Sequence, residues 1–268
     1  MTIQAVLAGI NPLLWSLIYL SGQVVIIIVA RRFTARSRDD ALVRIHLLAL
    51  VPTLAFTAGM FVLGGGQFSL DLPYAGVQIF WGALFSAGVF VLLLLAELWL
   101  GWVKLPHWGW QKGLSPKEVW QAVLLQVVGH AAVALNEEIV FRGYGLATLS
   151  SGIGLFPAAG VLIILFTLFH SITPRVIIYS TLGGILLTLF RLYTGTIWFG
   201  FGYHWLWNVI QTAIFGNPYR LPTLRPRYVS GPVMWVGDTG ENDGGMAGIV
   251  TTLVVIALVC GWWVIVGA

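Results

Sequence analysis

Two adjacent glutamates and an arginine interrupt a long apolar stretch of the chain, in the segment LNEEIVFRGYG at residues 135–145. Glu138 and Arg142 are four residues apart, so on a helix they share one face and can form an ion pair. Such pairing lowers the cost of holding either charge in a low-dielectric environment. Glu137 points about 100° away around the helix, so Arg142 reaches it less easily. Its carboxylate is therefore a candidate general base.

Two histidines and an amide further along the chain could work with Glu137. Glu137 and His170 are equally distant from the turn SSGIG at residues 150–154, so an antiparallel helical hairpin would bring them to a similar depth. His204 and Asn208 are four residues apart and share one face of a helix. We therefore expect a single cavity to contain all four side chains.

The elements that must position these residues are apolar helices. The chain of 268 residues is 58% hydrophobic and 9% charged, against roughly 25% charged residues in an ordinary soluble domain. A membrane-spanning helix needs about 20 mostly apolar residues. We predict an all-α polytopic membrane protein with about eight transmembrane helices, which form a single membrane domain over residues 1–268. The expected spans are 10–30, 42–64, 76–101, 118–148, 153–173, 175–194, 196–215 and 246–267.

The basic residues predict an orientation. Twelve of the fourteen Lys and Arg residues lie in connections on one side of the eight-helix path, and the positive-inside rule makes that side cytoplasmic. Glu137 and His170 lie toward the same side, so we expect the cavity to open toward the cytoplasm. Because the charges are spread over several connections, they do not indicate a nucleic-acid partner. We expect an integral protein of a prokaryotic cell membrane, embedded in the lipid bilayer.

The same polar residues resemble a known family. EEIVFRG at 137–143 matches the EExxxR motif of the CPBP family, which includes the type II CAAX prenyl endopeptidases. FTLFH at 166–170 matches the family's FxxxH motif, and HWLWN at 204–208 matches its HxxxN motif. The three motifs occur in the family order. The resemblance implies an intramembrane endopeptidase whose CAAX protease-like catalytic core covers residues 115–215.

The resemblance also implies a role for each candidate residue. Glu137 and His170 would activate a water molecule that attacks the scissile carbonyl. His204 and Asn208 would polarise that carbonyl and stabilise the oxyanion that forms. The substrate would be a membrane-associated protein or peptide, prenylated substrates included.

The sequence leaves open whether a metal takes part. The HExxH motif of soluble zinc proteases is absent. Glu137, His170 and His204 could still form a His₂Glu zinc site, with water as the fourth ligand. The alternative is a glutamate protease that uses the same groups without metal.

A non-proteolytic function is the competing interpretation. Charged residues inside a membrane also have structural uses, and the resemblance implies that Glu138 and Arg142 hold their helix in place. A transporter or a scaffold protein could use the remaining polar groups as a relay or ion site. Transporters often show inverted repeats, and we find none in this sequence. The variant Glu137→Gln discriminates, because a protease would lose turnover whereas a scaffold would keep its function.

Overall fold

The structure, a computed structural model, is almost entirely helical in the part of the chain that it describes. The described residues also form two short antiparallel strands, β1 (Val103–Lys104) and β2 (Tyr228–Val229). The predicted class, an all-α polytopic membrane protein, is confirmed. The described residues are 11–34, 41–64, 70, 72–105, 113–170, 173–216, 223–225, 227–237 and 245–266.

Six helices in the described ranges are long and apolar enough to cross a membrane, so the predicted count of eight is not confirmed. The predicted span 153–173 contains α7 (Leu155–Leu168), which has 14 residues and is followed by a turn at Phe169. The predicted span 196–215 contains the 12-residue α9 (Trp198–Val209) and the π-helical η2 (Ile210–Ile214). The six are α2 (Pro12–Thr34), α3 (Ala41–Gly64), α4 (Leu72–Trp99), the continuous helix Pro116–Ile153, α8 (Pro174–Thr194) and α11 (Met246–Val266).

The continuous helix begins at a capping box. Ser115 Oγ accepts a hydrogen bond from the Glu118 backbone N–H, and the Glu118 carboxylate accepts one from the Ser115 backbone N–H at 2.7 Å. Pro116 occupies the first turn, where its missing N–H costs nothing. These contacts fix the start of α5 (Pro116–Glu137), the helix that carries Glu137.

The EExxxR motif lies in an irregular part of this helix. α5 is followed by the π-helical segment η1 (Glu138–Gly143) and then by α6 (Tyr144–Ile153). The Tyr144 N–H donates to Ile139 O, five residues back, as a π-helix requires. A Cβ on Gly145 would lie 2.0 Å from Val140 O, so the glycine permits this geometry. Single π turns inside α-helices are frequent at functional sites.

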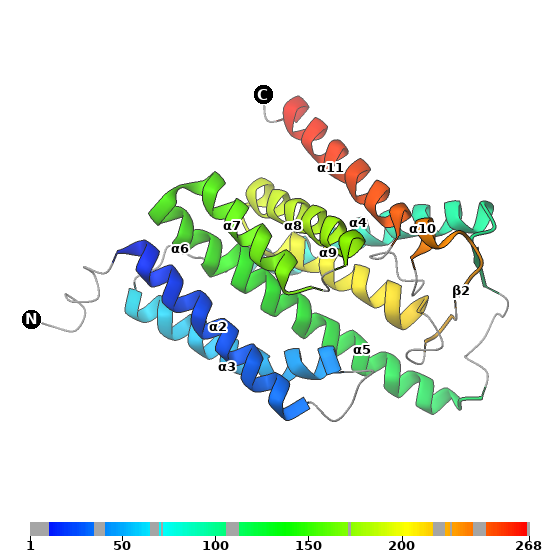
Figure 1. Ribbon diagram of the computed structural model, residues 1–268, viewed down its shortest axis with the longest axis horizontal. Helices are drawn as coiled ribbons and strands as arrows, with labels where there is room; N and C mark the ends of the chain where they lie inside the picture. Colours follow the sequence, from blue (N-terminus) through cyan, green and yellow to red (C-terminus); the bar gives the residue numbers. More distant parts are fainter. Residues whose placement is uncertain are drawn as a thin grey trace, which may run out of the picture.

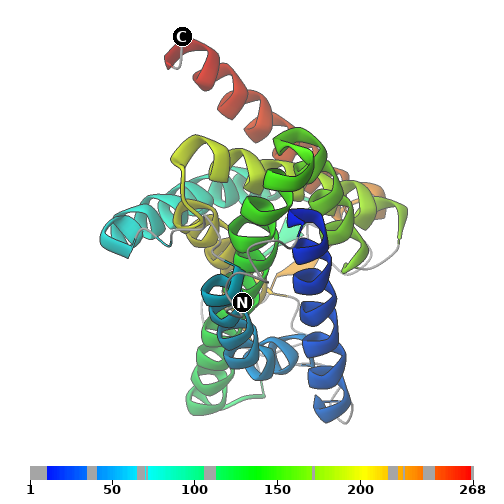
Figure 2. The same ribbon diagram turned by 90° about the vertical axis from the view of Figure 1, so that its left-hand side faces the viewer.

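The long helix lies at the centre of the arrangement. α2 and α3 lie along one side of it, and α7, α8 and α9 lie along the other (Figure 1; Figure 2 shows the same arrangement from the side). α11 packs on α8 and on the short α10 (Val233–Val236), and extends away from the bundle. Glu137 therefore lies where helices from both sides of the bundle can reach it.

Glycines allow α4 and α9 to approach each other closely. A Cβ on Gly82 would lie 2.1 Å from Phe199 O, and one on Gly202 would lie 2.3 Å from Ile79 O. Small residues at such interfaces let membrane helices pack backbone to backbone. This packing holds α9, and with it His204, against α4.

Candidate active site

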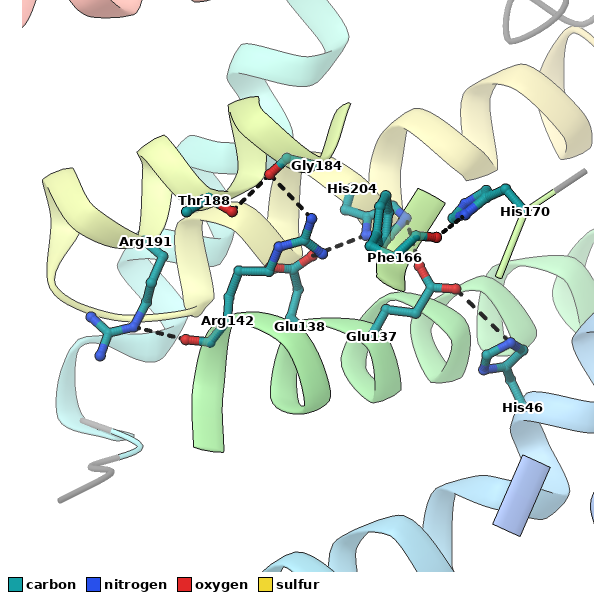
Figure 3. Close-up of polar contacts among 10 residues, drawn as sticks. All are labelled: His46, Glu137, Glu138, Arg142, Phe166, His170, Gly184, Thr188, Arg191 and His204. Carbon is teal, nitrogen blue, oxygen red and sulfur yellow. Dashed lines mark hydrogen bonds and ion pairs between the residues drawn. The ribbon is translucent and has the colours of Figure 1, made fainter. Parts of the chain in front are cut away.

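Glu137 is the last residue of α5, and its side chain is 13% exposed. Its carboxylate faces imidazoles from two other helices (Figure 3). Oε2 lies 3.7 Å from His204 Nε2, on α9, and Oε1 lies 4.0 Å from His46 Nε2, on α3. Three helices that are distant in the sequence thus meet at one carboxylate.

Glu138, the first residue of η1, is fully buried. Its Oε1 lies 3.4 Å from Arg142 Nη1, within the ion pair that the spacing of four residues favours. The same oxygen lies 3.2 Å from His204 Nδ1. The His204 ring therefore stands between two adjacent carboxylates, with one nitrogen toward each.

Arg142 is 1% exposed, and its polar groups have partners on several sides. Its Nη2 donates to Gly184 O at 3.2 Å, and its guanidinium carbon lies 4.2 Å from the centre of the Phe166 ring. Arg191 Nε donates to the Arg142 carbonyl at 3.1 Å. The Phe166 ring also lies 4.6 Å from the His170 ring, so it links the arginine of the first motif to the histidine of the second.

His170 lies just after α7 and is half-buried. Its Nδ1 is 2.8 Å from Phe166 O, and because a carbonyl only accepts, Nδ1 carries the proton in this contact. In a neutral ring this leaves Nε2 as an acceptor. His170 and Glu137 interact electrostatically, and Figure 3 shows both on the side of the network nearest His46.

Asn208 lies one helical turn beyond His204 and is half-buried. Its carbonyl accepts a hydrogen bond from Thr212 Oγ1 at 2.7 Å, and that hydroxyl lies 2.9 Å from His130 Nε2. Its side-chain amide does not join the contacts around Glu137 and Glu138 in the described part of the chain. The structure thus brings Glu137, Glu138, Arg142 and His204 into direct contact, with His170 in electrostatic range and Asn208 adjacent.

His46 is a residue of this site that the sequence analysis missed. It belongs to none of the three motifs and lies 91 residues before Glu137 in the chain. Asn136, which immediately precedes Glu137, donates from Nδ2 to the His46 carbonyl at 2.9 Å. The available signal was a histidine in an apolar helix, a residue type that inside a membrane suggests function.

The three predicted zinc ligands do not form a metal site as they are placed. Zinc requires its nitrogen and oxygen donors within about 2.2 Å of one ion. Among the described residues, no group of three His, Cys, Asp or Glu side chains is arranged to hold a metal ion. The ligand set Glu137, His170 and His204 stays a prediction, and the chemistry below uses only the chain's own groups.

Residues 118–210 match a family model described as type II CAAX prenyl endopeptidase Rce1-like. The matched range contains all three motifs and lies inside the predicted core 115–215. This part of the chain is therefore similar to a CAAX protease-like domain. This confirms the resemblance to the CPBP family and supports an intramembrane protease of the CAAX type. A search of curated proteins and a search of solved structures each found no match.

Proposed function

We propose that this protein is an intramembrane endopeptidase that cleaves a membrane-associated protein or peptide by means of glutamate-activated water. The observation that carries the proposal is the contrast between the two adjacent glutamates. Glu138 is paired with Arg142, whereas Glu137 faces two imidazoles and keeps a carboxylate that can accept a proton. A base within a low-dielectric surrounding, next to polar donors, is what water attack on a peptide bond needs.

Water activation is the first step of the proposed reaction. Glu137 takes one proton from a water molecule as the water oxygen bonds to the scissile carbonyl carbon. His170, whose Nδ1–H is engaged by Phe166 O, accepts the other water hydrogen at Nε2 and so orients the molecule. When the C–N bond breaks, the proton held by Glu137 passes to the leaving amine, and the carboxylate is regenerated.

Stabilisation of the oxyanion is assigned to His204 and Asn208. Glu138 holds the His204 ring at Nδ1, so the ring has a fixed orientation. In its doubly protonated form His204 donates from Nε2 to the oxyanion, and the Asn208 amide on the same helix face supplies a second N–H. Loss of one such donor typically costs about 10²–10³ in kcat.

The proposed substrate class includes proteins with a prenylated C-terminal peptide, because the matched family model is named for prenyl endopeptidases. Large apolar side chains are exposed on helices of the bundle, among them Leu92, Trp81 and Leu124. Such a surface suits a bilayer that would also hold the substrate's lipid chain. From the distribution of Lys and Arg we further propose that the site opens toward the cytoplasm. A reporter fused after residue 268 tests this, because it should then signal from the opposite side.

The test of the proposed function is peptide cleavage by the purified protein in lipid nanodiscs. Farnesylated peptides and their unmodified counterparts are offered to the wild type and to Glu137→Gln, with and without a zinc chelator. We expect Glu137→Gln to lower kcat by at least about 100-fold. Glu118→Gln is the matched control, because it makes the same change at an exposed capping position of the same helix. A folded wild type that cleaves none of a broad peptide library would contradict the proposal.

A further inference from the structure

α3 reaches the Glu137 carboxylate although it lies outside residues 118–210, the range of the family match. His46 is 8% exposed, and its Nε2 lies 4.0 Å from Glu137 Oε1. The other carboxylate oxygen, Oε2, is the one that faces His204. Each oxygen of the proposed base thus has its own imidazole.

The neighbouring amide of Asn136 determines which nitrogen of His46 carries the ring proton. Asn136 Nδ2 lies 2.9 Å from His46 O, and since a carbonyl only accepts, the amide nitrogen must face this side. The same Nδ2 lies 3.5 Å from His46 Nδ1. An amide nitrogen only donates, so Nδ1 is the unprotonated nitrogen. In the neutral ring the proton is then on Nε2, which points toward Glu137.

We infer that His46 is a positioning residue for Glu137, an inference that rests on the proposed function. Its Nε2–H points toward Oε1 and so restricts the direction of the carboxylate that takes the proton from water. The separation of 4.0 Å exceeds a direct hydrogen bond, so a small movement or one bridging water completes the contact. Asn136, which fixes the tautomer, directly precedes Glu137, the proposed base. The two residues therefore move as one unit.

A purely structural role for His46 can be separated from a positioning role, because the two depend on different atoms of the residue. Asn136 ties α5 to α3 through the backbone carbonyl of residue 46, which any side chain at that position retains. Removing the imidazole therefore spares this tie and removes the donor that faces Glu137. His46→Gln keeps an N–H donor of similar reach. His46→Leu keeps a side chain of similar size but has no hydrogen-bond donor.

The experiment measures kcat and KM separately for wild type, His46→Leu, His46→Gln and Glu137→Gln in nanodiscs, with thermal unfolding of each. We expect His46→Leu to lower kcat by roughly 100-fold, the scale of a misplacement of about 1 Å, with KM and the unfolding temperature unchanged. His46→Gln should recover most of the lost kcat. Equal rates for His46→Leu and wild type, or equal loss in both His46 variants, would overturn the inference.

His130→Leu is the matched control, because it removes another buried histidine, one that contacts Thr212. Its effect on kcat should be much smaller than that of His46→Leu, and an equal effect would indicate general disruption and count against the inference. If cleavage does not depend on Glu137, the proposed function fails and this role fails with it. If cleavage depends on Glu137 but not on His46, only the inference fails.

The tautomer gives a readout that does not need activity. Nitrogen-15 NMR of histidine-labelled protein, with His46 assigned by its substitution, should show Nε2 protonated and Nδ1 unprotonated. Asn136→Leu removes the amide donor and should weaken this preference. A proton on Nδ1 in the wild type would overturn the inference even in an active protease.

Discussion

Glu138 Oε1 lies 3.2 Å from His204 Nδ1, a contact that joins the first residue of η1 to the middle of α9 (Figure 3). Through it, the EExxxR motif and the HxxxN motif are parts of one polar network. The other nitrogen of His204 faces Glu137 at 3.7 Å. The direction of the His204 ring toward the proposed reaction centre therefore depends on Glu138, although Glu138 itself is fully buried.

The first prediction concerns the charge of Glu138. Glu138→Gln keeps the shape of the side chain but leaves Arg142 buried without its counter-charge, which typically costs about 3–5 kcal/mol. We expect a clearly lower thermal unfolding temperature in detergent and slower cleavage, although Glu137 is unchanged. The double variant Glu138→Gln with Arg142→Met should be less destabilised than the sum of the two single changes. Strictly additive losses would show that the two side chains do not interact.

The second prediction concerns the aromatic ring over Arg142. Phe166→Leu removes the cation–π contact at 4.2 Å, which is worth about 2 kcal/mol when it is desolvated, and it keeps the backbone carbonyl that binds His170. The unfolding temperature should fall. Phe169→Leu is the control, since Phe169 is 40% exposed and does not stack on the guanidinium. Equal effects of the two variants would contradict a specific role for Phe166.

Part of this site could be predicted from spacing alone. Glu138 and Arg142 need only a helix to share a face, and spacing of four residues is a local property. The membrane class likewise follows from composition, because an apolar fraction this large needs a lipid environment. The π-helical geometry at Glu138–Gly143 was not predicted, because the spacing of these residues does not indicate it. Arg191, which donates to Arg142 O within this segment, is 49 residues away in the chain.

The place of His46 could not be predicted for a related reason. Motif spacing does not say which face α3 turns toward α5, and that face is fixed by tertiary contacts such as the one from Asn136. The predicted count of eight spans is not confirmed, because hydropathy alone does not detect short interruptions of a helix. The turn at Phe169–His170 ends α7 early, and η2 replaces the last part of an otherwise apolar segment.

The third prediction tests the close packing of α4 and α9. Gly202→Ala would place a Cβ against the Ile79 backbone, and overpacking of this kind costs typically 1–3 kcal/mol. Because α9 carries His204, cleavage should fall together with stability. Gly88→Ala on α4 is the control, since a Cβ there meets nothing within 4 Å. If Gly202→Ala and Gly88→Ala behave alike in thermal unfolding, the helices do not depend on this contact.

The fourth prediction concerns a second buried ion pair, outside the candidate site. Arg227 Nη1 lies 3.2 Å from Glu97 Oε2, both side chains are 2% exposed, and the pair joins the end of α4 to the chain after η2. β1 and β2 lie beside it, and Ser230 N donates to Trp102 O. Arg227→Met should therefore cost about 3–5 kcal/mol, because it leaves Glu97 buried and unpaired.

The double variant Arg227→Met with Glu97→Met separates pairing from packing. If the ion pair serves mainly to neutralise a charge that the fold has buried, the double variant regains most of the lost stability, since two apolar side chains of similar length can fill the space. Thermal unfolding of both single variants and of the double variant measures this. Arg175→Met is the control, because Arg175 is only half-buried and contacts the same segment through Val233 O. A double variant less stable than either single variant would mean that this connection needs the two charged side chains themselves.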